Sequence, residues 1–173
     1  TEPFLQPPKS ILIKEILKSG IKINSIFVTS EAYEKYIDDL IQITSSSNQL
    51  NTKYKYDSKF LIDFDCLDEQ SMWSPDNESN AYLIFDFKSR KVRITNYTFQ
   101  TPINQTSDYP KSWTVDCSNN LANWYIIDVR KNESVMNKNN VSHTFICKNE
   151  PSEYYRYIRI TSDGPCWNGK NRY

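Results

Sequence analysis

The chain has 173 residues, a length that fits one domain, and its 21 Lys and Arg residues balance its 21 Asp and Glu residues. Because the charges are also interspersed, no long-range field favours nucleic acid or an anionic membrane as a partner. No stretch approaches the roughly 20 apolar residues of a membrane span, and an aromatic content of 14% favours a β-rich domain.

The first forty residues predict a helical extension. Apolar residues recur at helical spacing from Ile11 to Leu17, and Gly20 is a natural stop for that helix. A second short helix is expected over residues 31–40, where aromatic and aliphatic side chains share one face. We therefore expect residues 1–40 to form a helical N-terminal extension that packs on the domain.

Residues 41–173 predict short strands separated by turns. Trp113 and Val115 alternate with polar neighbours, which is the pattern of a strand with one buried face. Trp113, Trp124 and the pair Phe85 and Phe87 are predicted to pack in the core. The pattern favours a mainly β fold, an antiparallel β-sandwich. Residues 41–46 are strand-like, and the clearest strands are expected at residues 81–87, 92–99, 113–116, 124–129, 143–147 and 155–160.

In the last predicted strand, Arg156 and Arg159 are interleaved with aromatic residues. This spacing indicates cation–π pairing or a bidentate carboxylate contact across the sheet. A structural salt bridge is the favoured role for both, ahead of ligand binding.

The cysteines are widely spaced and form no Cys-x-x-Cys pair, so a structural zinc site is not expected. Each lies in or beside an apolar run, which favours free buried thiols and a reducing compartment, although two disulfides stay open. The four are Cys66, Cys117, Cys147 and Cys166. Glycosylation sequons, which would suit a secreted protein, occur at Asn77, Asn96, Asn104, Asn132 and Asn140.

The residues offer no catalytic constellation, and we expect no enzyme activity and no cofactor. The only histidine, His143, lies on a predicted strand, where histidine is usually a structural donor. Cys147, farther along the same strand, has the wrong placement for a Cys–His pair. Calcium stays open at one acidic loop whose spacing matches no EF-hand, formed by Asp63, Asp65, Asp68 and Glu69.

A series of segments in the second part of the chain carries a family pattern. They are Asn80–Lys88, Val92–Tyr97, Pro110–Trp113, Ser118–Asn119, Trp124, Ile127–Asp128, His143–Phe145 and Tyr155–Arg159, with Gly164 and Trp167–Asn168. In this order they resemble the coagulation factor 5/8 type C, or discoidin-like, domain over residues 41–173, closest to protist members that follow a BTB region. The resemblance implies a galactose-binding-like jelly roll that binds rather than catalyses, here without the family's last strand.

The resemblance also implies a ligand site, because family ligands usually meet loops at one end of the barrel. Those loops correspond to residues 51–56, 73–77, 101–109 and 161–171. Packing is the open alternative for their aromatic side chains. The candidate contact residues are Tyr54, Tyr56, Trp73, Asn104, Tyr109, Trp167 and Asn168.

Two functions compete for a noncatalytic module of this kind. The first is a protein-binding adaptor or structural component of an intracellular, cytoskeletal assembly, favoured by the cysteines, the neutral charge and the BTB-linked resemblance. The alternative is a secreted or cell-surface carbohydrate-binding, lectin-like domain, favoured by the sequons and the wider family. The sequence ranks the adaptor and an intracellular location first.

Overall fold

The computed structural model describes residues 41–47, 75–76, 78–101 and 109–170. The predicted N-terminal helical extension lies outside these residues. Within them, a single short 3-10 turn, η2 (Ser134–Met136), accompanies seven strands. These are β1 (Gln42–Ser45), β2 (Tyr82–Asp86), β3 (Asn96–Gln100), β4 (Trp113–Ser118), β5 (Tyr125–Arg130), β6 (Ser142–Ile146) and β7 (Tyr157–Ser162).

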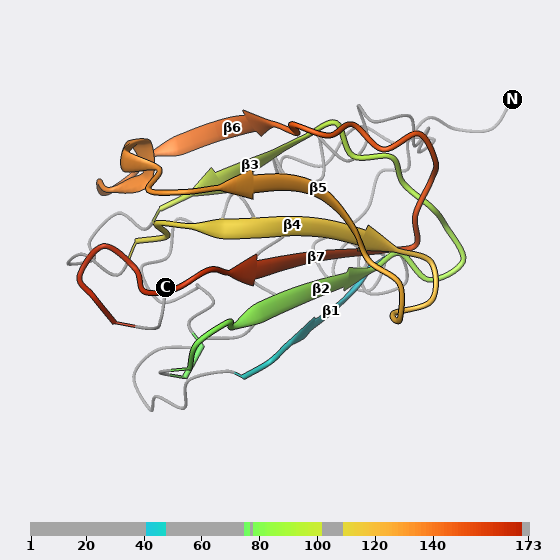
Figure 1. Ribbon diagram of the computed structural model, residues 1–173, viewed down its shortest axis with the longest axis horizontal. Helices are drawn as coiled ribbons and strands as arrows, with labels where there is room; N and C mark the ends of the chain where they lie inside the picture. Colours follow the sequence, from blue (N-terminus) through green and yellow to red (C-terminus); the bar gives the residue numbers. More distant parts are fainter. Residues whose placement is uncertain (1–40, 48–74, 77, 102–108, 171–173) are drawn as a thin grey trace, which may run out of the picture.

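The strands form two antiparallel sheets (Figure 1). One sheet has five strands in the order β1-β2-β7-β4-β5, and the other pairs β3 with β6. The expected mainly β, antiparallel architecture is confirmed. No helix in the described part of the chain has the length and apolar character needed to cross a bilayer.

One predicted strand, residues 92–99, is divided in two. Val92 forms an isolated bridge with Tyr155, and the ladder of β3 with β6 begins only at Asn96. Val92 and Ile94 are both buried, so the alternation in this segment reports burial correctly. Alternation does not indicate which strand a segment pairs with. Here Val92 pairs with Tyr155, just before β7, whereas the residues from Asn96 onward pair with β6.

The core lies between the two sheets. From the larger sheet, Val115 stands in register beside Ile160 of β7, and Leu83 of β2 flanks Ile160 on the other side. The smaller sheet adds aromatic rings, with Phe145 packing edge-on against Trp113 at a centroid distance of 5.1 Å. Fully burying one such side chain contributes roughly 1.5–3 kcal/mol. The predicted core positions of Phe85, Phe87 and Trp113 are confirmed.

The predicted core position of Trp124 is wrong. Trp124 is half-buried on the outer face of the larger sheet, where the guanidinium carbon of Arg159 lies 3.9 Å from a ring centroid. Arg159 is fixed there by Asp116, which accepts hydrogen bonds from Nε at 3.0 Å and a terminal nitrogen at 2.6 Å. The indole therefore packs against a fixed planar cation, a contact that strand alternation does not reveal.

The structural role predicted for the two arginines is confirmed. Arg156 makes a second bidentate pair, with Asp86 of β2, at 2.7 and 2.8 Å. The Arg156 guanidinium lowers the pKa of the Asp86 carboxyl. Arg156 also stacks on Tyr157, with its guanidinium carbon 4.7 Å from the ring centroid. Each arginine therefore pairs with a carboxylate on a neighbouring strand and also packs on an aromatic ring.

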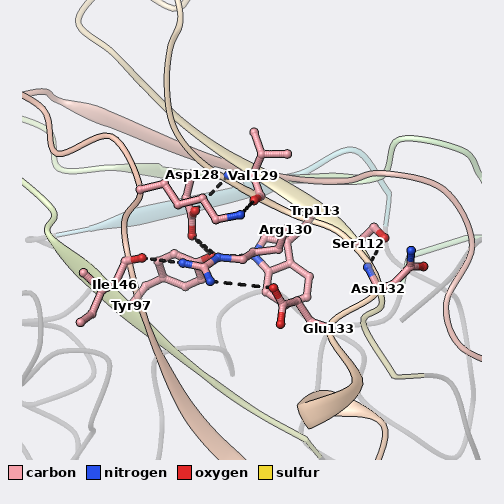
Figure 2. Close-up of polar contacts among 10 residues, drawn as sticks. Tyr97, Ser112, Trp113, Asp128, Val129, Arg130, Asn132, Glu133 and Ile146 are labelled. Atoms are coloured by element: carbon pink, nitrogen blue, oxygen red, sulfur yellow. Dashed lines mark hydrogen bonds and ion pairs between the residues drawn. The ribbon is translucent and has the colours of Figure 1, made fainter.

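A buried polar network links the two sheets (Figure 2). Asp128 of β5 is fully buried, and one of its oxygens accepts the Tyr97 hydroxyl proton and the Arg130 Nε proton, both at 2.7 Å. The Trp113 indole nitrogen in turn donates to the Tyr97 hydroxyl at 2.7 Å. Arg130 also reaches across to the carbonyl of Ile146 on β6. The network thus joins β4 and β5 of the larger sheet to β3 and β6 of the smaller one.

The outer edge of β5 is closed by donors from the segment after β6. Lys148 Nζ donates to the Val129 carbonyl at 2.6 Å, and the Asn149 amide donates to the Ile127 carbonyl at 2.9 Å. An open strand edge is a template for unwanted pairing with another chain. These contacts satisfy the edge of β5 and close the sandwich between β5 and β6.

The expectation of free buried thiols is confirmed for Cys117, Cys147 and Cys166, while Cys66 lies outside the described residues. Burial raises the pKa of the Cys117 and Cys147 thiols from 9.0 to about 12, and nearby carboxylates add to the rise. At neutral pH both side chains are therefore protonated, packed and protected from oxidation.

We expect Asp128→Ala to destabilise the fold by about 3–5 kcal/mol, because it strands a largely buried guanidinium and the Tyr97 hydroxyl without their acceptor. Urea unfolding followed by circular dichroism measures the change. Glu133→Ala is the matched control: Glu133 lies 3.8 Å from Arg130 but is partly exposed, so its loss is expected to cost less than about 1 kcal/mol. Equal losses would show that Asp128 is not the main acceptor.

We expect the two thiols to make stability fall at alkaline pH. Because their pKa is higher in the folded than in the unfolded chain, their contribution is intact below about pH 9 and is lost as the pH rises towards 12. Melting temperatures between pH 7 and 11 should fall less steeply for Cys117→Ala/Cys147→Ala than for the parent chain. Parallel pH profiles would contradict this assignment.

Candidate ligand-binding end of the sandwich

Four connections emerge at the same end of the sandwich, on the left in Figure 1. The strand registers place them together, because β2 and β4 begin there and β5 and β7 end there. We call this the loop end. Its described residues are 46–47, 75–76, 78–81, 101, 109–112, 131–141 and 163–170.

Hydrogen bonds tie these connections to one another. The Trp167 amide donates to the Tyr109 carbonyl at 3.2 Å, and the Asp163 amide donates to the Ser112 carbonyl at 2.9 Å. The Thr101 hydroxyl donates to the Lys138 carbonyl at 2.7 Å. The loop end is therefore a cross-braced surface, a property that lowers the entropy cost of binding.

The structure brings together three of the seven candidate contact residues, Tyr109, Trp167 and Asn168. Tyr109 is buried, in keeping with the packing alternative, and its hydroxyl donates to the Asn139 side-chain oxygen. Trp167 and Asn168 are half-buried. The other four candidates, Tyr54, Tyr56, Trp73 and Asn104, lie outside the described residues.

Trp167 carries a donor for which the described part of the chain offers no acceptor. Its indole Nε1 is buried, and no residue in the described part of the chain accepts its proton. The Lys111 ammonium nitrogen lies 5.2 Å from a ring centroid, so the aromatic ring sits beside a cation. A buried donor without an acceptor is costly and marks a place where an added oxygen atom would be favourable.

A tight turn holds Asn168 beside Trp167. The side-chain oxygen of Asn168 accepts the Lys170 amide proton at 2.9 Å and lies 2.7 Å from the Cys166 sulfur. Gly169 adopts a φ of 84°, a conformation that residues with a side chain rarely adopt. The turn therefore fixes the direction in which Trp167 leaves the backbone.

Two residues of this end were absent from the sequence-based candidates. Lys111 lies in the segment that leads into β4, and Asn139 lies in the connection between β5 and β6. That connection is rich in asparagine, and Asn132 and Asn140 adopt positive φ values of 54° and 50°. The run of asparagines was a signal for a shaped loop, since Asn tolerates this conformation and offers exposed amides.

The arrangement offers an aromatic ring, two amide side chains and a cation within one cross-braced surface. It offers no nucleophile activated by a base, since the only histidine, His143, lies on β6 packed against Phe145 at 4.6 Å. Within the described residues there is also no group of three or more metal-binding side chains. The acidic loop considered for calcium lies outside those residues.

Residues 42–173 match the family model of the F5/8 type C domain. No curated protein sequence matches the chain. Several solved structures match the fold of the chain. One of them is CpGH89CBM32-5 from Clostridium perfringens in complex with GalNAc-β-1,3-galactose. That superposition has a TM-score of 0.60 at 12% identity and covers 76% of this chain and 89% of the other.

Two further structures show the same likeness. A family 32 carbohydrate-binding module of C. perfringens NanJ, in complex with galactose, has a TM-score of 0.55 at 12% identity and covers 76% of this chain and 88% of the module. A fucolectin from striped bass serum, Morone saxatilis, has a TM-score of 0.55 at 17% identity, with 79% of this chain and 45% of the lectin covered. At these identities the likeness establishes a shared fold.

We expect Trp167→Phe to change stability by no more than about 1 kcal/mol, because the lost indole N–H has no acceptor in the described structure. Trp113→Phe is the matched comparison, since it removes a buried donor to Tyr97 and core volume, and should cost about 2 kcal/mol or more. Urea unfolding of both variants tests the difference. A large loss for Trp167→Phe would show that its ring is mainly structural.

Proposed function

The chain belongs to the F5/8 type C domain family, and on this premise we propose that it is a noncatalytic carbohydrate-binding module whose glycan site lies at the loop end. Two structures of the same fold hold GalNAc-β-1,3-galactose and galactose. These ligands support galactose-type sugars as the first class to test.

Trp167 is the observation that carries the proposal. Sugars present C–H faces that pack on aromatic rings and hydroxyl groups that need donors and acceptors. Trp167 provides a half-exposed ring and a buried N–H that lacks an acceptor in the described structure. A sugar hydroxyl at this position would accept that proton and remove the cost of leaving it unpaired.

The neighbouring residues have distinct roles in this proposal. Lys111 donates to hydroxyl groups beside the ring, and Asn139, which is exposed, offers amide contacts from the facing connection. Tyr109 is a positioning residue, because its buried hydroxyl holds the Asn139 amide in one orientation. Fixing the amide in advance lowers the entropy lost when a sugar binds.

The comparisons favour the carbohydrate-binding alternative over the intracellular adaptor that the sequence ranked first. The solved relatives are carbohydrate-binding modules and a serum lectin. The proposal therefore includes an extracellular or cell-surface location. Buried thiols are compatible with that location, because burial raises the pKa of Cys117 and Cys147 and protects both from oxidants.

We expect isothermal titration with galactose and N-acetylgalactosamine to detect binding, and Trp167→Ala to weaken it at least about tenfold, or about 1.4 kcal/mol. Trp167→Phe, which keeps a ring but removes the N–H, should fall between the two. Tyr109→Phe should weaken binding less, since it frees Asn139 without removing a contact.

Tyr154→Ala is the control, because Tyr154 is 53% exposed at the opposite end of the sandwich and should leave sugar affinity unchanged. A glycan array extends the search to other sugars. Retention of no glycan by the parent chain, or equal affinities for Trp167→Ala and the parent, would refute the proposal.

A further inference from the structure

The opposite end of the sandwich is a second distinct surface. It is formed by three connections whose residues are all described: 87–95 between β2 and β3, 118–124 from the last residue of β4 to β5, and 147–156 between β6 and β7. We call it the basic end. It lies on the right in Figure 1, a full strand length from the loop end.

Cross-links make the basic end rigid. Val92 and Tyr155 exchange two backbone hydrogen bonds of 2.8 Å, which tie the first connection to the third. The Asn119 side chain ties the second to the third, accepting from the Arg156 amide at 3.1 Å and donating to the Tyr154 carbonyl at 3.3 Å. Within the second, the Ser118 and Asn120 side chains cap four consecutive backbone amides.

The basic end carries a local charge surplus in a chain of zero net charge. Its three connections hold six cationic side chains and two carboxylates, and of these Arg93 pairs with Glu150 and Arg156 pairs with Asp86 of β2, whereas the described residues of the loop end hold four of each. The surplus comes from one connection, where Arg90 and Lys91 are exposed between Lys88 and Arg93. A concentrated surplus of this kind attracts acidic groups and orients them on approach.

Large apolar side chains are also exposed on and next to the second and third connections. Leu121, Tyr125 and Tyr154 are 49%, 47% and 53% exposed. The ring of Tyr125 lies parallel to that of Tyr155, with an interplanar angle of 5° and a centroid distance of 6.4 Å. In the antiparallel bridge of Val92 with Tyr155, Arg93 stands opposite Tyr154, so the basic and aromatic parts are contiguous.

Leu121 is held exposed at a conformational cost. Its φ is 62°, in the left-handed region that costs a residue with a side chain roughly 1–2 kcal/mol. Asparagine or glycine would fit the position better, and the loop already uses asparagine on both sides. Strain retained at an exposed apolar residue is typical of a contact surface.

We propose that the basic end is a docking surface for a protein partner, which it recognises through an acidic segment that carries an apolar or aromatic anchor. Arg90 and Lys91 contact the acidic side chains, while Leu121 and the tyrosines receive the anchor. Tyr and Arg are the residues that most often dominate protein interfaces. An interleaved apolar surface fits a peptide better than a phosphate backbone, which calls for a continuous basic track.

The test uses a short fluorescein-labelled peptide that alternates Asp-Glu with Leu-Tyr pairs, titrated with the full chain and read by fluorescence polarisation. One matched peptide has Ser-Gly in place of Leu-Tyr, and another has Lys-Arg in place of Asp-Glu. We expect the acidic apolar peptide to bind at least about tenfold more tightly than either, because only it offers both the charge and the anchor.

Two variants test the charges. Arg90→Glu/Lys91→Glu should weaken binding of the acidic apolar peptide at least about tenfold, through loss of attraction and new repulsion. Lys138→Glu/Lys170→Glu makes the same charge change with exposed residues of the loop end and should leave binding within about twofold.

Leu121→Asn tests the anchor. Asparagine tolerates the positive φ, so the melting temperature should stay the same or rise, while the acidic apolar peptide binds at least about fivefold more weakly. Loss of binding without loss of stability separates a contact role from a structural one.

Several results would overturn the proposal. They are equal binding of the three peptides, equal losses for the two charge-reversal variants, and unchanged binding by Leu121→Asn. Tight binding of heparin or of phosphatidylserine vesicles in preference to the peptide would assign the surface to another ligand. The proposal is independent of sugar binding: Arg90→Glu/Lys91→Glu should keep its galactose affinity, so either proposal can fail alone.

Discussion

The sandwich depends on a single buried acceptor, the carboxylate of Asp128. The two sheets share no backbone ladder in the described residues, so most of the specific contact between them comes from side chains, beside single backbone bonds such as that of the Asn149 amide with the Ile127 carbonyl. Asp128 provides it by accepting protons from Tyr97 of the smaller sheet and Arg130 of its own strand. Burial raises the pKa of the Tyr97 hydroxyl, and the carboxylate adds to the rise, so this donor keeps its proton. A buried polar group contributes to a unique structure when each of its partners is satisfied.

The same network supports the loop end. Arg130 is the last residue of β5, and its guanidinium lies near Glu133 at the start of the connection that carries Asn139. The Glu133 amide donates to the Lys111 carbonyl at 2.9 Å and so ties this connection to the segment before β4. The ammonium group of the same Lys111 lies beside the Trp167 ring. The position of Lys111 and Asn139 thus depends, through two steps, on how β5 is anchored in the core.

Strand alternation predicted most of the framework, and its failures have identifiable causes. Val115 and Trp113 follow the pattern and are buried, but β5 does not, because a bulge opposite Val115 and Asp116 leaves Ile127 and Asp128 both buried. Alternation alone therefore predicts that Asp128 is an exposed aspartate, although it is the buried acceptor of the network. The predicted position of Trp124 was wrong because its packing partner, Arg159, comes from β7, which is distant in the sequence. At the loop end, aromatic type pointed to Trp167, whereas Asn139 depends on a tertiary bond to Tyr109 that no local pattern contains.

The two ends differ in the balance of their exposed charges, and this difference underlies the separate function proposed for each. Among the described residues of the loop end, cations and carboxylates are equal in number and Lys131 pairs with Asp163, which favours hydrogen bonding and ring stacking as the means of recognition. At the basic end, the cations exceed the carboxylates and lie beside exposed rings, so attraction acts at longer range and apolar burial follows on contact. Because the strands of one sandwich join the two ends, ligands at each would be held at a fixed separation. The two proposals therefore assign a glycan and a protein partner to opposite ends of one molecule, where both could be bound without a change of shape.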